Sequence, residues 1–447
     1  MNQALKMNDD DLYISAIIRT KLFQAYAQYK DFFYLFPLLL MFAFILGTPA
    51  TLLEGNDDLL ALQGVDNATR QLVLGMCFIM AFIGMLNRAS NADYQLHNQK
   101  LMFVLLFFTL VSMTWSPLPF LTLKRWLQFA GILFAGWCAL GTANPQQRLL
   151  KMMRYLFGVI MLASVVAFLV RPDISIDGAT GAWKGLYAHK NTLGLITAIV
   201  VSLWLPVISR QNKMEKYAGI LVWGLAVFVA WKSQSATAIV SISTITMFYF
   251  FVSVPIRWGL KISLAPIPLL LGLLWLYNTQ HLGLTDLILN GLGRDASMTG
   301  RTELWPYVWK SFQEHLFFGV GYNSFWTGFN VETAAMVEQI GWQATQSHNG
   351  YLDILNETGI IGASIFALIT LQMFVRMQRL FLVDKGSAMT MFLLLITQLI
   401  ANLVESSFAR GTSPGWIIFL VIYVALAISV PMRPNQKATA HISENGA

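Results

Sequence analysis

Twelve long apolar runs constrain the fold of this chain more than any other feature of its sequence. A helix that crosses about 30 Å of hydrocarbon needs about 20 residues, and most connectors between these runs are too short to hold a soluble domain. We therefore expect an all-α polytopic membrane protein with about twelve transmembrane helices. The runs cover residues 31–53, 71–87, 101–118, 122–141, 152–170, 190–208, 217–231, 236–255, 260–278, 359–378, 386–404 and 412–431.

The composition supports a membrane protein and excludes several other classes. Only 12% of the 447 residues are charged, which is about half the share in a soluble domain, and the mean hydropathy is +0.57. These values exclude a disordered chain, a nucleic-acid-binding domain and an ordinary cytosolic enzyme. In a membrane protein the net charge of +7 reports topology rather than a nucleic-acid partner.

The distribution of Lys and Arg predicts how the chain lies in the membrane. With the N-terminus in the cytoplasm, 19 of the 30 basic residues fall in or beside cytoplasmic connectors, as the positive-inside rule requires. Both termini are then cytoplasmic, and the one long connector faces the periplasm or the cell exterior. The expected segments are a cytoplasmic N-terminus (1–30), spans 1–9 (31–278), an outer loop with short helices (279–358), spans 10–12 (359–431) and a cytoplasmic tail (432–447).

Three polar motifs lie at the predicted outer boundary, where an ionisable side chain is costly unless it faces a wet cavity or a ligand. The first is His189-Lys190-Asn191, at the entrance to the sixth apolar run. It predicts either a ligand-binding group or a polar cap on an interfacial helix. Arg294 and Arg410 are added as candidates on charge and location alone. The outer basic residues that we assign to lipid headgroups instead are Arg70, Lys124, Arg125 and Arg171.

The second motif surrounds Arg301 in the long loop. Thr302 is a suitable N-cap, and Pro306 is tolerated only in the first turn of a helix, so we expect a helix that starts near residue 303. Arg301 beside the free N–H groups of this helix would bind a phosphate or diphosphate, and the alternative is a headgroup anchor. A predicted apolar stripe places the helix on the membrane surface and consists of Trp305, Trp309, Phe312 and Leu316.

The third motif runs from Ser347 to Gly362. Ser347 is a candidate cap for a short helix, which would place His348 in the first helical turn. A helix N-terminus disfavours imidazolium, so His348 would stay neutral and able to accept a proton. The alternative is a purely structural histidine.

Together the three motifs resemble those of the bacterial O-antigen ligase/polymerase superfamily, which includes exopolysaccharide polymerases of the ExoQ type. The resemblance covers roughly residues 180–405. A ligase-type pattern is matched by His348-Asn349, nine residues, Gly359, two residues and Gly362. The arginine motif of the large loop is matched by Thr299-Gly300-Arg301 followed by Trp305. A motif of exopolysaccharide polymerases is similar to His189-Lys190-Asn191-x-Leu193-Gly194.

The resemblance implies a GT-C-type glycosyltransferase of the bacterial inner membrane. Such an enzyme moves a glycan from undecaprenyl diphosphate to an acceptor at the periplasmic face, without a metal or another cofactor. By the resemblance, His348 matches the catalytic histidine and Arg301 the diphosphate-binding arginine. Glu303 and Glu357 are reserve candidates for the base. The candidates for substrate binding are His189, Lys190, Asn191, Arg294, Glu303, Asn349, Tyr351 and Arg410.

Two activities within this family and one outside it stay open. A polymerase joins the glycan to another lipid-linked repeat unit, whereas a ligase joins it to lipid A-core, and the His-Lys-Asn motif favours the polymerase. A flippase or transporter also has about twelve spans, but it would place its charges near the bilayer midplane and usually lacks an outer loop of 80 residues. The expected partners are the lipid-linked donor, the glycan or lipid A-core acceptor, membrane lipids and a candidate chain-length regulator, with no nucleic acid.

Overall fold

The computed structural model describes eleven stretches of the chain, and these are mainly helical. The one strand-like pairing within them is an isolated bridge between Ile176 and Trp183. The expectation of an all-α protein is therefore confirmed for these residues, while the ninth apolar run (260–278) lies outside them. The described stretches are 30–46, 68–86, 98–142, 144–178, 180–187, 189–209, 212–253, 301–327, 330–342, 344–411 and 413–428.

The helices follow the apolar runs wherever both are described. Residues 30–46 form the first of them. The others are α4 (Ala68–Leu86), α6 (Lys100–Val111), α7 (Pro119–Ala139), α8 (Pro145–Val170), α9 (Pro172–Ser175), α10 (Lys190–Trp204), α11 (Lys213–Lys232), α12 (Ala236–Ser253), α16 (Arg301–Glu314), α17 (Val331–Ile340), α18 (Gly350–Val383), α19 (Lys385–Ala401) and α20 (Pro414–Ile428). Short 3-10 turns extend α6 and α10.

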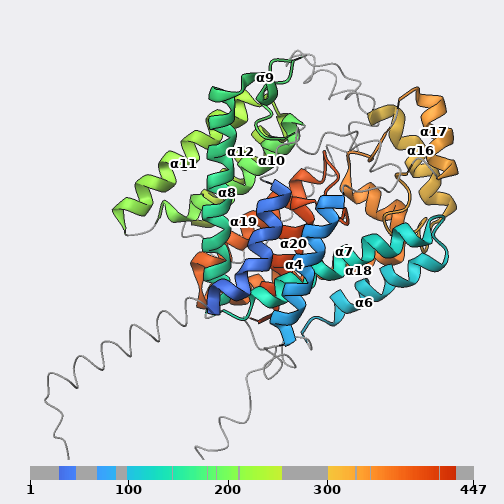
Figure 1. The fold of residues 1–447 in the computed structure, drawn as a ribbon, viewed down its shortest axis with the longest axis horizontal. Coiled ribbons are helices and arrows are strands. Elements are labelled where there is room, and N and C mark those ends of the chain that lie inside the picture. The colour runs from blue at the N-terminus through green and yellow to red at the C-terminus, as the bar shows by residue number, and fades with distance from the viewer. Residues whose placement is uncertain are drawn as a thin grey trace, which may run out of the picture.

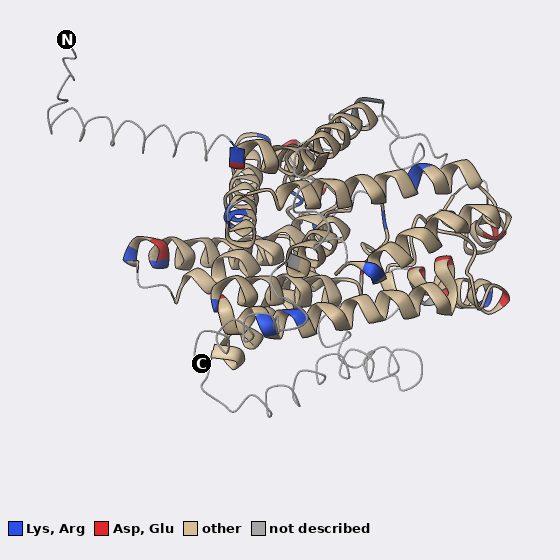
Figure 2. Ribbon diagram, turned by 90° about the horizontal axis from the view of Figure 1, so that it is seen from below, with Lys and Arg blue, Asp and Glu red and all other residues tan. Residues whose placement is uncertain are grey.

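Four of these helices are long and apolar enough to cross a membrane on their own. They are Pro145–Val170, Lys190–Val207, Lys213–Lys232 and Gly350–Val383, and five shorter apolar helices accompany them. Figure 2 shows that long parts of the helices carry no Lys, Arg, Asp or Glu. The length and composition of these helices thus support a membrane protein. That the chain crosses the membrane twelve times stays a prediction.

α20 forms the centre of the helical bundle (Figure 1). Every residue from Trp416 to Ala427 is buried, as is typical of a helix that is apolar on all sides and surrounded by other helices. Its neighbours are α7, α18 and α19, while α10 packs against α8, α11, α12 and α19. The segments that precede α10 and α20 are therefore brought to neighbouring parts of one bundle.

The described part of the long loop folds around a hydrophobic cluster of its own. This cluster joins α16, α17 and the start of α18, and consists of Leu304, Val308, Val320, Phe325, Trp326, Met336 and Ala344. Two of the four residues in the predicted apolar stripe of α16 are buried. Trp305 and Phe312 are buried, whereas Trp309 and Leu316 are 48% and 37% exposed, because the face that includes Leu304 and Val308 packs inward.

The start of α16 differs from the prediction. The helix already includes Arg301, and Pro306 is its sixth residue. Thr302 is therefore a helical residue rather than the N-cap. Pro306 therefore lies beyond the first turn, where it has no backbone N–H to donate to the preceding turn.

A sharp kink at Gly359 divides α18 into a short outer helix and a long inner one. Gly359 has φ 63° and ψ −171°, a conformation that essentially only glycine adopts. The backbone of residues 316–321 crosses the kink so closely that a Cβ on Gly359 would lie 2.4 Å from the carbonyl carbon of Phe317. Four backbone hydrogen bonds of 2.9–3.2 Å join the two segments. This crossing fixes the short helix, and the residues on it, against the loop.

Candidate functional site

Two of the three polar motifs meet at Glu405, in the loop between α19 and α20. Asn191 Nδ2 donates to Glu405 Oε1 at 2.7 Å, and His348 Nδ1 lies 3.2 Å from Glu405 Oε2. Ser235 Oγ donates to Asn191 Oδ1 at 3.2 Å and so fixes the orientation of this amide. Gln346 Nε2 lies 3.3 Å from His348 Nδ1. Side chains from four separate segments thus form one hydrogen-bonded network.

The backbone holds His348 just outside the short helix rather than inside it. The N-cap of α18 is Asn349, whose Oδ1 accepts hydrogen bonds from the backbone N–H groups of Tyr351 (3.1 Å) and Leu352 (3.2 Å). His348 precedes this cap and has a left-handed φ of 55°. The prediction that Ser347 caps the helix and that His348 lies in its first turn is therefore wrong. Ser347 lies two residues before the cap, and its Oγ instead accepts the backbone N–H of Asn349 at 3.1 Å.

This geometry changes the reason why His348 is suited to accept a proton. In the tautomer with its hydrogen on Nδ1, His348 donates to the Glu405 carboxylate and Nε2 keeps its lone pair, whereas in the other tautomer Nδ1 accepts from Gln346 Nε2. The His348 side chain is 28% exposed, so part of the ring is open to solvent. A neighbouring carboxylate, and not the first turn of a helix, is therefore the partner of this histidine.

Arg410 is held by a buried ion pair beside the network. Its Nη2 donates to Asp353 Oδ2 at 2.6 Å, and its Nη1 donates to the carbonyl of Thr345 at 3.1 Å. The other oxygen of Asp353 accepts the indole N–H of Trp326 at 2.9 Å. Burial acts to lower the pKa of Arg410, but the charges of Asp353 and Glu357 outweigh it and hold this pKa above its ordinary value. Arg410 therefore fixes the segment before α18 with a permanent charge.

The remaining candidates on α18 each make at least one hydrogen bond within the fold, while Oε1 of Glu357 is buried without a hydrogen-bond partner. Glu357 is 2% exposed, and its Oε2 accepts the backbone N–H of Asn323 at 3.0 Å. Tyr351 donates its hydroxyl hydrogen to the carbonyl of Leu399 at 2.8 Å. Asn349 caps the helix. These contacts favour positioning roles for Tyr351 and Asn349 over direct contact with a substrate.

The structure describes the other candidates to different extents. His189 is exposed at the N-cap of α10, and Lys190 is half-buried as the first residue of that helix. Glu303 is exposed in the first turn of α16. Arg301 begins α16, but its side chain is not among those described, and Arg294 lies outside the described residues.

Sequence reasoning missed two carboxylates that organise this site. Glu405 directly follows the predicted eleventh span (386–404), and an acidic residue at an outer boundary is a signal that could have been used. Asp353 falls inside the third motif, five residues after His348. In both cases the partner of the carboxylate is far away in the sequence, so spacing alone did not reveal the pair.

The fold and the site together define a class: a helical membrane protein with a histidine–carboxylate pair where loops from different parts of the chain meet. Within the chain, residues 219–367 match the O-antigen ligase family. The chain is also 23% identical over 348 residues to the exopolysaccharide production protein ExoQ of Rhizobium meliloti (strain 1021), an alignment that covers 74% of this chain and 77% of the relative. These two findings confirm the similarity to the O-antigen ligase and ExoQ-type superfamily. The family match includes His348 and Arg301, whereas Asn191 and Glu405 lie beyond its limits.

Proposed function

We propose that this protein is a GT-C-type glycosyltransferase of the bacterial inner membrane that polymerises O-antigen or exopolysaccharide repeat units. It would move a glycan from undecaprenyl diphosphate to an acceptor sugar hydroxyl at the periplasmic face. Both comparisons support the coarser role of a membrane polymerase or ligase. The observation that carries the finer proposal is the contact of 3.2 Å between His348 Nδ1 and Glu405 Oε2, because it leaves Nε2 as a base for the acceptor hydroxyl.

The proposed reaction is a single displacement at the anomeric carbon. The acceptor oxygen forms a bond to this carbon while its proton passes to Nε2 of His348. The bond from the anomeric carbon to the diphosphate oxygen breaks, and the electron pair leaves with undecaprenyl diphosphate. General-base catalysis of this kind contributes about 10²–10⁴-fold to the rate. The step inverts the anomeric centre and needs no metal, since Arg301 and Lys190 would stabilise the departing charge.

A transfer assay with purified protein tests this function. Lipid-linked single repeat units, supplied as both donor and acceptor, are expected to yield a ladder of longer lipid-linked glycans. The description of the matching family as O-antigen ligase favours a second candidate, transfer to lipid A-core. A ligase would leave the single units unchanged until lipid A-core is added. If the protein transfers no glycan to either acceptor, the proposed function is wrong.

The proposed orientation predicts which face of the membrane carries the loop. A cysteine introduced as Val331→Cys is expected to react with an impermeant maleimide in intact spheroplasts, because Val331 is 82% exposed at the start of α17. The two native cysteines, Cys77 and Cys138, are buried and give little background. The matched control is Met214→Cys, which is 79% exposed on a predicted cytoplasmic connector and should react only after permeabilisation. If Met214→Cys reacted in intact spheroplasts and Val331→Cys only after permeabilisation, the proposed orientation would be wrong.

A further inference from the structure

We propose that Asn191 and Ser235, as positioning residues, keep the hydrogen of the His348 ring on Nδ1. They act through the carboxylate of Glu405, which lies between the Asn191 amide and the ring. The catalytic consequence of this coupling rests on the proposed function, whereas the coupling itself rests on the contacts of the described residues. Asn191 of the first polar motif would then serve the histidine of the third motif instead of contacting a substrate.

The contact between His348 and an ionised Glu405 is attractive in only one tautomer of the ring. A charged carboxylate only accepts hydrogen bonds, so Oε2 at 3.2 Å from Nδ1 attracts an Nδ1–H group and repels a lone pair on Nδ1. A protonated Glu405 would instead donate to Nδ1, and the hydrogen of the ring would then reside on Nε2. The amide of Gln346 lies 3.3 Å from Nδ1 and 3.5 Å from Oε2, so it finds an acceptor with either tautomer. The tautomer therefore depends on an ionised Glu405 whose Oε2 faces the ring.

Asn191 favours this ionised and oriented carboxylate. Its Nδ2 donates to Glu405 Oε1 at 2.7 Å, and a hydrogen bond to the charged form of an acid stabilises that form. The same bond occupies Oε1 and leaves Oε2 as the oxygen that faces His348. Asn191 has this effect only if its NH₂ group, and not its oxygen, is turned toward Glu405.

Ser235 determines which way the amide of Asn191 faces. This serine directly precedes α12 and is buried, and its Oγ accepts the backbone N–H of Ala238 at 3.4 Å, as the side chain of an N-cap residue does. Its hydroxyl hydrogen is then available to Asn191 Oδ1 at 3.2 Å. Because the amide oxygen is bound to Ser235, the NH₂ group points to Glu405.

Gly194 allows α10 to approach α12 closely enough for this contact. It follows Asn191 by three residues, so both lie on one face of α10. A Cβ on Gly194 would lie 2.9 Å from Ser235 Oγ and 2.8 Å from the Cβ of Ala238, and something would have to shift. The spacing of Asn191 and Gly194 in the first motif thus has a physical reason.

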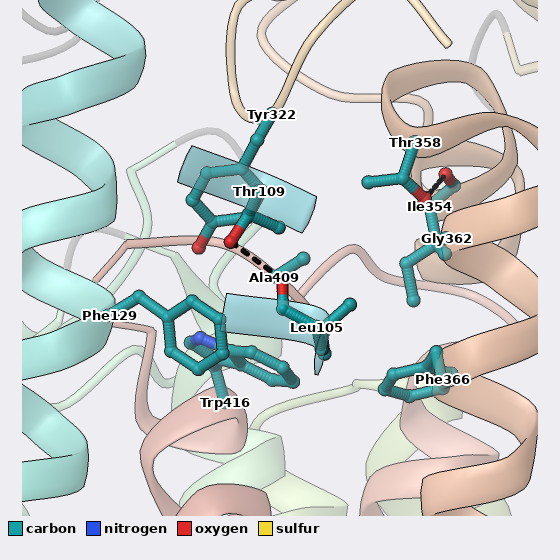
Figure 3. Close-up of a pocket in the computed structure, with 10 residues that line it drawn as sticks. All are labelled: Leu105, Thr109, Phe129, Tyr322, Ile354, Thr358, Gly362, Phe366, Ala409 and Trp416. Atoms are coloured by element: carbon teal, nitrogen blue, oxygen red, sulfur yellow. Dashed lines mark hydrogen bonds between the residues drawn. The ribbon is translucent and has the colours of Figure 1, made fainter. Parts of the chain in front are cut away.

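The backbone around Glu405 is held independently of its side chain. The backbone N–H of Gly350 donates to the carbonyl of Asn402 at 2.9 Å and to that of Glu405 at 3.2 Å. Further along the same loop, Ala409 lines a small apolar pocket together with Phe366 (Figure 3). The loss of the Asn191 amide should therefore change the orientation and protonation of the Glu405 side chain while the loop stays in place.

The test observes the tautomer of His348 directly. Full-length protein with nitrogen-15-labelled histidine is reconstituted in phosphatidylcholine and studied by solid-state NMR at alkaline pH, where the nitrogen shifts distinguish Nδ1–H from Nε2–H. The chain has six histidines, and the signal that disappears in His348→Gln identifies this one. The wild type is expected to show Nδ1–H. Asn191→Leu is expected to show mainly Nε2–H and to lower kcat about tenfold or more, as for a lost charge-assisted hydrogen bond, with little change in the KM for the lipid-linked donor.

Further variants disturb or spare the same network. Glu405→Gln places an amide donor beside Nδ1 and supplies the reference signal for the Nε2–H tautomer. Ser235→Ala and Gly194→Ala, which leave the Asn191 side chain itself intact, should shift the His348 signal in the same direction as Asn191→Leu. The matched control is Ser202→Ala, which removes the hydrogen bond of 2.7 Å between α10 and Thr397 of α19 and should keep the tautomer and kcat of the wild type.

Several outcomes would overturn this coupling. One is an Nε2–H signal for His348 in the wild type. Another is an unchanged tautomer in Asn191→Leu, even with a lower kcat, because Asn191 would then act in some other way. Should Asn191→Leu not fold, an unchanged tautomer in both Ser235→Ala and Gly194→Ala would equally contradict it. If the tautomer shifts as expected but the wild type transfers no glycan, the coupling stands and the proposed function is wrong.

Discussion

His348→Gln is expected to lower kcat for glycan transfer by at least about 10²-fold, while the KM for the lipid-linked donor changes little. Glutamine keeps the hydrogen-bonding capacity that contacts Glu405 at 3.2 Å in the wild type, but it cannot accept a proton from the acceptor hydroxyl. The variant therefore separates the role of a base from that of a structural hydrogen bond. The measurement is kcat and KM with lipid-linked repeat units.

A second histidine of the same loop offers a matched control. His315 Nε2 lies 3.7 Å from Glu332 Oε1 and is 36% exposed, so His315→Gln also alters a histidine–carboxylate pair. It lies at the junction of α16 and α17 rather than in the network of Glu405, and transfer should persist. Substantial transfer by His348→Gln would contradict the base assignment. Glu303, which is exposed, would then be the candidate, ahead of the buried Glu357.

Arg410→Ala is expected to lower the free energy of unfolding by about 3–5 kcal/mol. The substitution leaves the carboxylate of Asp353, which is 2% exposed, without its ion-pair partner at 2.6 Å. An unpaired buried charge is costly because water no longer solvates it. The segment before α18 would loosen with it, since Arg410 also binds the carbonyl of Thr345. Chemical or thermal unfolding of the purified protein measures the change.

The double variant Arg410→Met/Asp353→Leu shows whether the loss of stability comes from the missing ion pair or from the buried carboxylate that is left unpaired. It removes both charges, so most of the stability should return. Arg171→Ala breaks an exposed pair with Asp173 and should change stability little, because solvent screens such pairs. If Arg410→Ala proved as stable as Arg171→Ala, the ion pair would not hold the loop in place.

The helices could be predicted from the sequence because their signal is local. Apolar runs of nearly twenty residues predict helices regardless of what surrounds them, and α8 and α18 follow the runs that predicted them. Helix ends were less predictable. The choice between Ser347 and Asn349 as N-cap, and the start of α16 before Pro306, depend on which backbone geometry the rest of the loop permits.

Local sequence also indicated His348, Asn191 and Arg410 as candidates, because polar side chains at a membrane boundary are costly unless they face a cavity, a partner or a ligand. It could not say what they contact. Glu405 joins residues that are 214 and 57 positions away, and Asp353 meets Arg410 across 57 positions. Arg125, which the sequence assigned to lipid headgroups, lies against Gly411. Helical periodicity determines which face of each helix is apolar, but only the packing of the helices around α20 decides which loops become neighbours and which charges find partners.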